Sequence, residues 1–406
     1  MKKCVFTIVA KNYIGLGKIL MNSVKKYNPG VEIRILVADD YTNTEHDSEI
    51  ISIKELVKIE KDLWDNMALK YDITEFCTAL KPFCFIKLFD AFEKLIYLDP
   101  DILLFNSLDS VWDWLDKYSI ILTPHVSRIH ENYSGELPEN QLLGTGVFNL
   151  GFCAFSNSEC SKKIVNWWCQ KLINHCFSDL YNYLYTDQHW MDLIPAYCPN
   201  ELYVITDLGY NVAPWNFFER RIIKEHDSLY VQERDVKNEK KTPLVFVHYS
   251  GYKYKELLSG HIEQKNIQKK ISYNDISFIL DAYRIHLNQN REIFMKYIMM
   301  SYSYNSYIQG DDITYFHRRL YNSIAQNKDL NIEEFYLSLK KNKLIINSRN
   351  TEKESIHTMN NMNNYVNKLN FLFRIIFKVI GYDKYILLIK AMRYYSRYEN
   401  HSFLVK

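Results

Sequence analysis

Short apolar runs alternate with amphipathic stretches through roughly the first 250 residues of the chain. Apolar runs bounded by turn residues predict buried strands, and apolar positions three and four apart predict helices. The predicted strands span residues 5–10, 32–38, 94–105, 120–123, 147–155, 202–205 and 244–247. The predicted helices span residues 15–26, 73–92, 107–116, 159–176 and 187–193. Because strands and helices alternate, the sequence predicts an α/β fold built from βαβ units.

Beyond residue 254 the chain is rich in Lys, Asn, Tyr and Ile, and its pattern predicts helices through to the end. We therefore expect two domains, residues 1–254 and a helical C-terminal region of residues 255–406. Residues 351–364 are polar and predict a linker. Residues 371–398 mix apolar side chains with Arg and Lys. Such a segment can lie on an anionic membrane, dock on the protein itself or pair subunits in a homo-oligomer; docking is the preferred interpretation.

Composition narrows the class of protein. A formal net charge of +2 does not favour a nucleic-acid-binding protein, which would present a strongly basic face. The eight cysteines include no Cys-x-x-Cys pair and predict buried thiols in a reducing compartment. The first apolar run is too short for a signal peptide, and no run is long enough to span a bilayer. We expect a cytoplasmic protein, with peripheral attachment to the inner face of the membrane left open.

Two carboxylates interrupt the apolar run 94–105, at Asp99 and Asp101. Ligands of open α/β sheets lie at the carboxyl ends of the strands, where these side chains are expected. Carboxylates two residues apart on a bent strand end can bind Mg²⁺ or Mn²⁺, which in turn can hold a diphosphate. The alternative is an ordinary Asp-Pro-Asp turn, in which Asp accepts local backbone hydrogen bonds.

Three further positions resemble parts of a site, each with a structural alternative. Asn12 and Tyr13 follow the first strand and can bond to and stack on a base, or form a turn. Lys81, beside a proline, can offer a cation to phosphate or sugar, or be solvated. Asn149 and Gly151 lie within a predicted strand, where these residue types are disfavoured and usually mark close approach of a ligand or backbone.

The last two elements lie further along the chain. Asp187 and Gln188 precede a short helix, and a charge that favours the helix N-terminus is the simpler explanation for Asp187. His248 ends a second apolar strand and is followed by Gly251 and Lys253. This repeats the design of a buried strand that ends in a group able to bind a metal.

Taken together, these motifs resemble the retaining glycosyltransferases of the glycogenin and bacterial lipooligosaccharide galactosyltransferase type. The resemblance covers residues 3–254 and implies the glycosyltransferase A-type fold, a Rossmann-like mixed sheet flanked by helices. It implies that Asp99, Asp101 and His248 bind Mn²⁺ or Mg²⁺. It also implies the contacts of a nucleotide sugar, with catalytic positions at Asp187, Gln188 and Asn149 and donor contacts at Ala10, Asn12, Tyr13, Lys81, Asp99, Gly151, Gly251 and Lys253.

The implied activity is transfer of a hexose, with UDP-hexose as the expected donor, to a hydroxyl of a glycan, lipid-linked or protein acceptor. Retention of configuration and a role in bacterial surface polysaccharide assembly are expected. Two departures bear on the donor: Lys253 stands closer to Gly251 than in the family, and Ala10 and Lys11 replace an acidic pair, whose base contact Asp39 or Asp40 could supply. A toxin-like protein glycosyltransferase and a non-catalytic carbohydrate-binding protein on the same fold are the alternatives. A nucleotidyltransferase would need a richer glycine loop than Gly15-x-Gly17.

Overall fold

The computed structural model describes residues 2–43, 46–234, 236, 240–265, 273–325, 331–345 and 363–405. The chain divides into two compact units, each of which is discontinuous in sequence. The first comprises Met1–Lys61 and Ile73–Ser303, and the second comprises Asp62–Asp72 and Tyr304–Lys406. The boundary predicted at residue 254 stays a prediction, and the compact units do not divide there.

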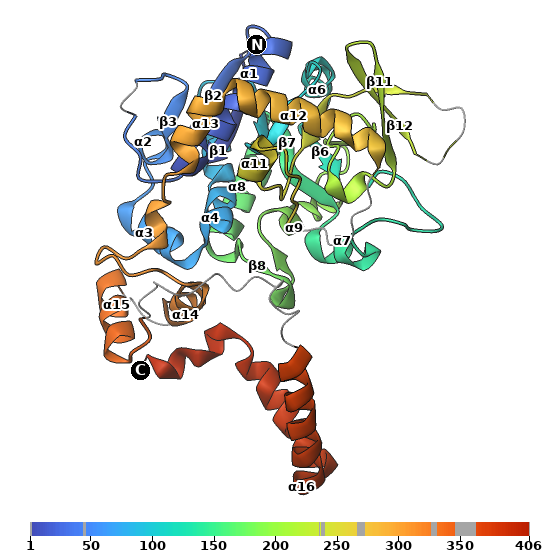
Figure 1. The fold of residues 1–406 in the computed structure, drawn as a ribbon. Helices are drawn as coiled ribbons and strands as arrows, with labels where there is room; N and C mark the ends of the chain where they lie inside the picture. Colours follow the sequence, from blue (N-terminus) through green and yellow to red (C-terminus); the bar gives the residue numbers. More distant parts are fainter. Residues whose placement is uncertain are drawn as a thin grey trace. The chain divides into compact units, whose positions relative to one another are not determined.

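A seven-stranded mixed sheet forms the centre of the first unit (Figure 1). Its strand order is β10-β6-β7-β4-β1-β2-β3. The strands are β1 (Lys3–Val9), β2 (Glu32–Val37), β3 (Ile50–Ser52), β4 (Lys94–Leu98), β6 (Ile120–Pro124), β7 (Phe148–Ser156) and β10 (Leu202–Val204). Only β7 is antiparallel to its neighbours, β4 and β6, and the other pairings are parallel. This confirms the expected fold class, an α/β fold with a mixed sheet.

Helices and short strands surround this sheet. The helices of the first unit are α1 (Ile14–Tyr27), α2 (Ile53–Val57), α4 (Ile73–Ala79), α5 (Lys81–Leu88), α6 (Asp109–Trp114), α7 (Glu139–Thr145), α8 (Glu159–His175), α9 (Gln188–Met191), α10 (Ile194–Tyr197), α11 (Tyr254–Leu258), α12 (Ser277–Gln289) and α13 (Arg291–Ile298). The remaining strands are β5 (Ile102–Leu104), β8 (Ser178–Asp179), β9 (Leu184–Tyr185), β11 (Arg220–Glu225), β12 (Ser228–Glu233), β13 (Thr242–Pro243) and β14 (Phe246–His248). The pattern of the sequence did not reveal the hairpin of β11 and β12.

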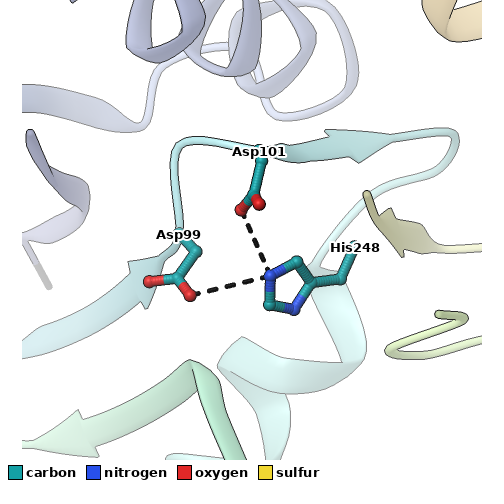
Figure 2. A group of neighbouring side chains, drawn as sticks. All are labelled: Asp99, Asp101 and His248. Atoms are coloured by element: carbon teal, nitrogen blue, oxygen red, sulfur yellow. Dashed lines mark ion pairs between the residues drawn. The ribbon is translucent and has the colours of Figure 1, made fainter. Parts of the chain in front are cut away.

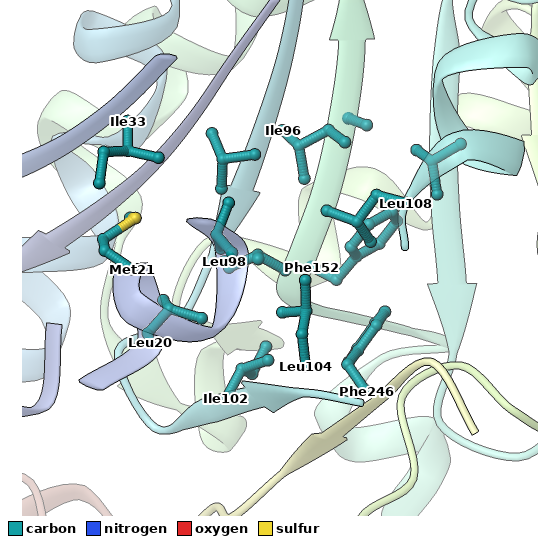
Figure 3. Close-up of a cluster of buried hydrophobic side chains, with 14 of the residues drawn as sticks. Leu20, Met21, Ile33, Ile96, Leu98, Ile102, Leu104, Leu108, Phe152 and Phe246 are labelled. Carbon is teal, nitrogen blue, oxygen red and sulfur yellow. The ribbon is translucent and has the colours of Figure 1, made fainter. Parts of the chain in front are cut away.

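Apolar side chains from the sheet, α1 and α6 form a continuous core (Figure 3). Ile96, Leu98 and Phe152 come from β4 and β7, whereas Leu20 and Met21 come from α1. The core extends to the short pair β5 and β14 through members that the figure also labels, Ile102, Leu104 and Phe246. The elements that carry the candidate site are therefore fixed by burial of their own apolar residues.

Two helix boundaries differ from the sequence prediction for local reasons. The predicted helix 73–92 is two helices, α4 and α5, with Pro82 in the first turn of α5. Proline is tolerated there because its missing N–H would have no partner inside the helix. The predicted helix 107–116 is shorter in the structure, where α6 begins at Asp109 and has Leu108 as its N-cap.

The second unit is helical in the part that the structure describes. It contains α3 (Lys61–Lys70), α14 (Tyr315–Ala325), α15 (Ile332–Lys341), α16 (Asn363–Tyr395) and the 3-10 helix η8 (Tyr398–Leu404). Its core combines Leu69 of α3 with Leu320, Phe335 and Leu339. The buried Arg318 guanidinium donates to the carbonyls of Ala68, Leu69 and Tyr71 and so joins the two segments of the unit. Most of the predicted linker 351–364 lies outside the described residues.

Candidate active site

Two short strands bring the predicted metal ligands together. After β4 ends at Leu98, the chain turns, and the amide of Ile102 donates to the carbonyl of Asp99. Strand β5 then pairs antiparallel with β14, which places His248 opposite Ile102. The amide of Tyr249 donates to the carbonyl of Asp101 at 2.9 Å and extends this pairing. Residues almost 150 positions apart therefore meet at the carboxyl edge of the central sheet.

The imidazole of His248 faces both carboxylates (Figure 2). Its Nε2 atom lies 3.1 Å from Oδ1 of Asp101 and 3.6 Å from Oδ2 of Asp99. One ligand atom from each of the three residues lies within 4.8 Å of the others. The Asp99 side chain is 28% exposed and that of His248 only 4%, so the group is anchored on one side and open to solvent on the other.

Asn149 and Gly151 explain how the imidazole is oriented. Nδ1 of His248 lies 3.1 Å from Oδ1 of Asn149, an oxygen that can only accept a hydrogen bond. A proton on Nδ1 leaves Nε2, which faces the carboxylates, free to bind a metal. A Cβ atom on Gly151 would lie 2.4 Å from Cε1 of His248. Both residues reach this edge because β7 runs antiparallel to β4, with Gly151 opposite Asp99.

Three aromatic residues that no sequence motif indicated support the ligands. The Tyr97 hydroxyl donates to Oδ1 of Asp99 at 2.6 Å, and the Tyr254 hydroxyl donates to Oδ2 of Asp101 at 2.8 Å. The Trp215 ring packs edge-on against His248, with 5.3 Å between ring centroids. Tyr97 lies two residues before Asp99, on the same face of the strand, a spacing that could have indicated its role.

Electrostatics couple the ligands to one another. Burial opposes ionisation of Asp101, but the charge and hydrogen bond of His248, with the Tyr254 hydroxyl, hold the pKa of that carboxyl below its usual range. Burial likewise opposes protonation of His248, yet Asp101 and Asp99 raise the pKa of the imidazole above 6.5. Without a metal, the two carboxylates therefore favour the protonated imidazole of His248, whose positive charge lies where a metal ion would bind.

Lys81 and Asp187 form a buried ion pair beside this group. Nζ of Lys81 lies 2.8 Å from Oδ2 of Asp187 and 3.9 Å from Oδ1 of Asp99, and it donates to the Leu150 carbonyl. Both side chains are at most 2% exposed. Burial favours the neutral lysine, but Asp187 and Asp99 outweigh it and raise the pKa of Lys81. This burial excludes the alternative of a solvated Lys81. Asp187 does stand at the N-cap of α9, although its side chain makes no capping hydrogen bond, so a charge at the helix N-terminus stays an alternative for this residue.

Asn12 and Tyr13 lie in the 3-10 helix η1 (Lys11–Tyr13), which follows β1 and whose Tyr13 amide donates to the carbonyl of Ala10. The Tyr13 ring packs edge-on against Tyr254, and burial raises the pKa of Tyr13 to about 12. Oδ1 of Asn12 is buried and has no hydrogen-bond partner among the described residues. Tyr13 therefore lies beside Tyr254, whose hydroxyl bonds to the proposed ligand Asp101.

The carboxylates considered as substitutes for the family's acidic pair have other contacts. Asp39 is fully buried and accepts hydrogen bonds from the amides of Lys11 and Ser303. Asp40 forms an ion pair with Lys54 at 2.5 Å.

The remaining predicted positions are more widely spread. Gln188 is the first residue of α9, and its side-chain amide donates to the Thr145 carbonyl. Gly251 has a φ of +76°, which favours glycine, and lies in the turn after β14. Lys253 points to Glu263, with 2.5 Å between Nζ and Oε1, and its side chain is 42% exposed. The structure thus brings Gln188 close to α7, while Lys253 is held by an acid outside the metal group.

This donor set suits a divalent cation. Two carboxylates supply the hard oxygens that Mg²⁺ and Mn²⁺ prefer, and a neutral imidazole nitrogen extends the range to transition metals. Asn149, Tyr97 and Tyr254 bond to the ligands themselves, as outer partners do in metal sites.

Comparison with known proteins identifies the family. The sequence profile of glycosyl transferase family 8 matches residues 4–255. The chain belongs to glycosyl transferase family 8. This match covers more than half of the chain and confirms the resemblance inferred from the motifs. The protein is therefore a glycosyltransferase, and all of its predicted site residues lie inside the matched region.

Three proteins similar to this family 8 glycosyltransferase are 16–22% identical to it in sequence. The uncharacterized protein YfnF of Bacillus subtilis (strain 168) is 22% identical over 286 residues, which cover 68% of this chain and 89% of YfnF. The galactosyltransferase LgtC, solved with donor and acceptor sugar analogues, superimposes with a TM-score of 0.41 at 16% identity, over 73% of this chain and 97% of LgtC. The apo form of GlyE from Streptococcus pneumoniae TIGR4 gives a TM-score of 0.38 at 16% identity. The match covers 74% of this chain and 65% of GlyE.

Replacement of Gly151 tests the orientation of His248. Gly151→Ala is expected to push the imidazole away from the carboxylates, because the new Cβ would lie 2.4 Å from its Cε1 atom. Metal affinity, measured by calorimetric titration with Mn²⁺, should fall about 10- to 100-fold, as for the loss of an outer partner. Gly144→Ala is the control, since its Cβ would meet Leu180 at an ordinary 3.5 Å. Equal affinities in the two variants would contradict the assignment.

Removal of one partner tests the buried pair of Lys81 and Asp187. Asp187→Asn removes the nearest counter-ion of a buried ammonium and should lower the free energy of unfolding by about 3–5 kcal/mol. Adding Lys81→Met should restore much of that loss, as measured by denaturant unfolding. The exposed pair of Lys87 and Asp90 is the control, where Asp90→Asn should cost less than about 1 kcal/mol. A small loss in Asp187→Asn would show that the pair is not buried in solution.

The raised pKa of His248 predicts that protons compete with the metal. In the metal-free protein, the stability contributed by the imidazolium is present below 6.5 and is lost as the pH rises through the raised folded-state value. Metal affinity should therefore rise with pH over the same interval, with release of about one proton per ion. Titration calorimetry in buffers of different ionisation enthalpy measures this release. The release should be absent in His248→Asn, and a wild-type affinity independent of pH would contradict the prediction.

Proposed function

We propose that this glycosyltransferase moves a hexose from UDP-hexose to a hydroxyl of a glycan, using Mn²⁺ or Mg²⁺, with retention of configuration. The observation that carries the proposal is the group formed by Asp99, Asp101 and His248 at the edge where ligands of such sheets bind. A divalent cation can neutralise the charge of a diphosphate donor, and this group offers a place for one. The buried pair of Lys81 and Asp187 beside it gives the donor sugar polar partners.

Asp99, Asp101 and His248 would hold the ion. When bound, a divalent ion acts as a Lewis acid on the diphosphate and neutralises the charge that develops as the nucleotide leaves. The protein fixes these ligands before any donor arrives, because Tyr97, Tyr254 and Asn149 already bond to them. Such preorganised electrostatics is usually the largest contribution to catalysis.

The nucleoside would lie against η1. The unpartnered Oδ1 of Asn12 can accept from a base N–H, which uracil offers, and Tyr13 supplies an aromatic surface. Ala10 would contribute backbone contacts at the end of β1. Gly251 and Lys253 would approach the diphosphate, and for Lys253 this requires exchange of Glu263 for a phosphate oxygen.

The donor sugar would contact Asn149, Gly151, Lys81, Asp187 and Gln188. Asp187 is buried and bound to Lys81, an arrangement that favours a positioning role over that of a nucleophile. We therefore propose transfer on a single face of the sugar. The bond from the anomeric carbon to the phosphate oxygen breaks, the bond to the acceptor oxygen forms, and the acceptor proton passes to the leaving phosphate.

For the acceptor and the cellular location, we propose only a class of molecule and a side of the membrane. A glycan or lipid-linked glycan of bacterial surface polysaccharide is the acceptor class we propose, with the enzyme at the cytoplasmic side of the membrane. Among the described helices, none is long and apolar enough to cross a bilayer. Transfer to a protein hydroxyl is the second acceptor class, and a panel of glycan and peptide acceptors separates the two.

A panel of nucleotide sugars tests the proposal. Wild-type protein should hydrolyse or transfer from a UDP-hexose only with Mn²⁺ or Mg²⁺, and chelation should abolish turnover. Asp101→Asn and His248→Ala should each lower turnover at least about 100-fold, because each removes a ligand. Asp113→Asn, an exposed carboxylate of α6, is the control and should keep full activity. NMR of the first-formed product should show the donor's anomeric configuration.

Two outcomes would overturn these assignments. Turnover that persists in Asp101→Asn would remove the metal role of this group. Failure of every UDP-sugar, with turnover of another nucleotide sugar, would leave the enzyme class intact and replace the donor.

A further inference from the structure

Helix α16 is a helical hairpin rather than one straight rod. Gly381 interrupts it with a φ of +75°, a conformation that favours glycine. The rings of Phe377 and Tyr385, which lie on opposite sides of Gly381, approach to 5.2 Å between centroids, and those of Phe373 and Tyr385 to 6.4 Å. In a straight helix, residues eight positions apart are separated by about 12 Å along the axis. The two halves therefore fold back on one another.

The hairpin buries almost none of its apolar surface within its unit. From Val366 to Tyr395 no side chain is buried. The half-covered ones are Phe373, Ile376, Ile380, Tyr385, Ile386 and Leu388. Phe371, Val379 and Leu387 are each about two-thirds or more exposed, at 66%, 77% and 68%. The other exposed large apolar or aromatic residues are Val366, Leu369, Leu372, Ile375, Phe377, Tyr382, Ile389, Met392, Tyr394 and Tyr395. The docked helix that the sequence analysis preferred is therefore not seen within this unit.

The charge of the hairpin is strongly one-sided. Between Asn363 and Tyr395 the basic residues are Lys368, Arg374, Lys378, Lys384, Lys390 and Arg393, and the single acidic residue is Asp383. Arg374 and Lys378 are four residues apart, and Lys390 and Arg393 are three apart, so each half places two cations on one face. Long basic side chains can lie over apolar surface while their charged ends reach water or phosphate.

We propose that α16 lies on the surface of a membrane that contains anionic phospholipids and holds the enzyme there. An exposed apolar surface bordered by Lys, Arg and Tyr fits the interface between acyl chains and anionic headgroups. A second copy of the hairpin fits less well, because pairing would bring twelve cations together with only two acids. The absence of a crossing helix among the described residues agrees with a position on the bilayer rather than through it.

The C-terminal segment ties the hairpin to the folded part of its unit. In η8, Tyr398 packs edge-on against Phe316 of α14 at 5.3 Å between centroids. The hydroxyl of Ser338 in α15 donates to the carbonyl of Val405 at 2.8 Å. These contacts connect the C-terminal end of α16, through η8, to helices α14 and α15 of the second unit.

Vesicle co-sedimentation of the full chain tests the proposal. Binding should be strong to vesicles of phosphatidylcholine with phosphatidylglycerol, weak to phosphatidylcholine alone, and reduced by salt. Reversal of three cations, in Lys378→Glu with Lys384→Glu and Lys390→Glu, should weaken binding to the anionic vesicles at least about 100-fold. Because these side chains are exposed, the variant should keep its melting temperature and its hydrolysis of the donor in solution.

Two further variants distinguish three possible contributions to vesicle binding: the charge of the hairpin, its apolar surface, and the net charge of the whole protein. Phe371→Gln with Leu387→Gln keeps the charge and should also weaken binding, because it removes apolar surface that enters the interface. Reversal of three exposed lysines of the first unit, in Lys2→Glu with Lys117→Glu and Lys163→Glu, is the matched control and should leave binding within about threefold of wild type.

Three results would overturn the proposal: equal binding to both kinds of vesicle, loss of binding in the matched control, or a stable dimer that fails to bind vesicles and dissociates in the hairpin variants. Because donor hydrolysis needs no vesicle, loss of membrane binding with full hydrolysis refutes only this proposal. Loss of hydrolysis with full membrane binding refutes only the proposed reaction.

Discussion

The site depends on the antiparallel pairing of β5 and β14, two strands of only three residues each. This pairing sets His248 opposite Ile102 and so fixes the distance from the imidazole to Asp101. Strands this short are not stable by themselves and are held by burial of Ile102, Leu104 and Phe246 in the main core. The position of His248 therefore depends on the packing of the main core and not only on the short strand that carries it.

The direction of β7 is the second requirement. If β7 ran parallel to β4, its start would lie at the opposite edge of the sheet, far from Asp99. Because it is antiparallel, Asn149 and Gly151 reach the metal group from the first residues of the strand. One residue then orients the imidazole by a hydrogen bond, and the other leaves the space that the ring occupies. Topology therefore decides which residues support the ligands.

Much of this could be predicted from the sequence, but with clear limits. Asp99, Asp101 and His248 were predictable because polar groups at the ends of apolar runs are costly unless they have a use. Trp215 and Tyr254 were not, because aromatic residues are common in cores and nothing local indicates which metal ligand they contact. The pairing of Lys81 with Asp187 was also missed, since a partner so distant in sequence is set by folding alone.

Average composition misled in one respect. A net charge of +2 describes the whole chain as nearly neutral, yet α16 alone carries six basic residues and one acidic residue. The rest of the chain must therefore be net acidic, and an acidic body is repelled by an anionic membrane. With such a distribution, the attraction to an anionic surface is concentrated in the basic hairpin. The opposition of charges within one chain thus supports the proposed contact of the hairpin with an anionic membrane, which the mean charge would not indicate.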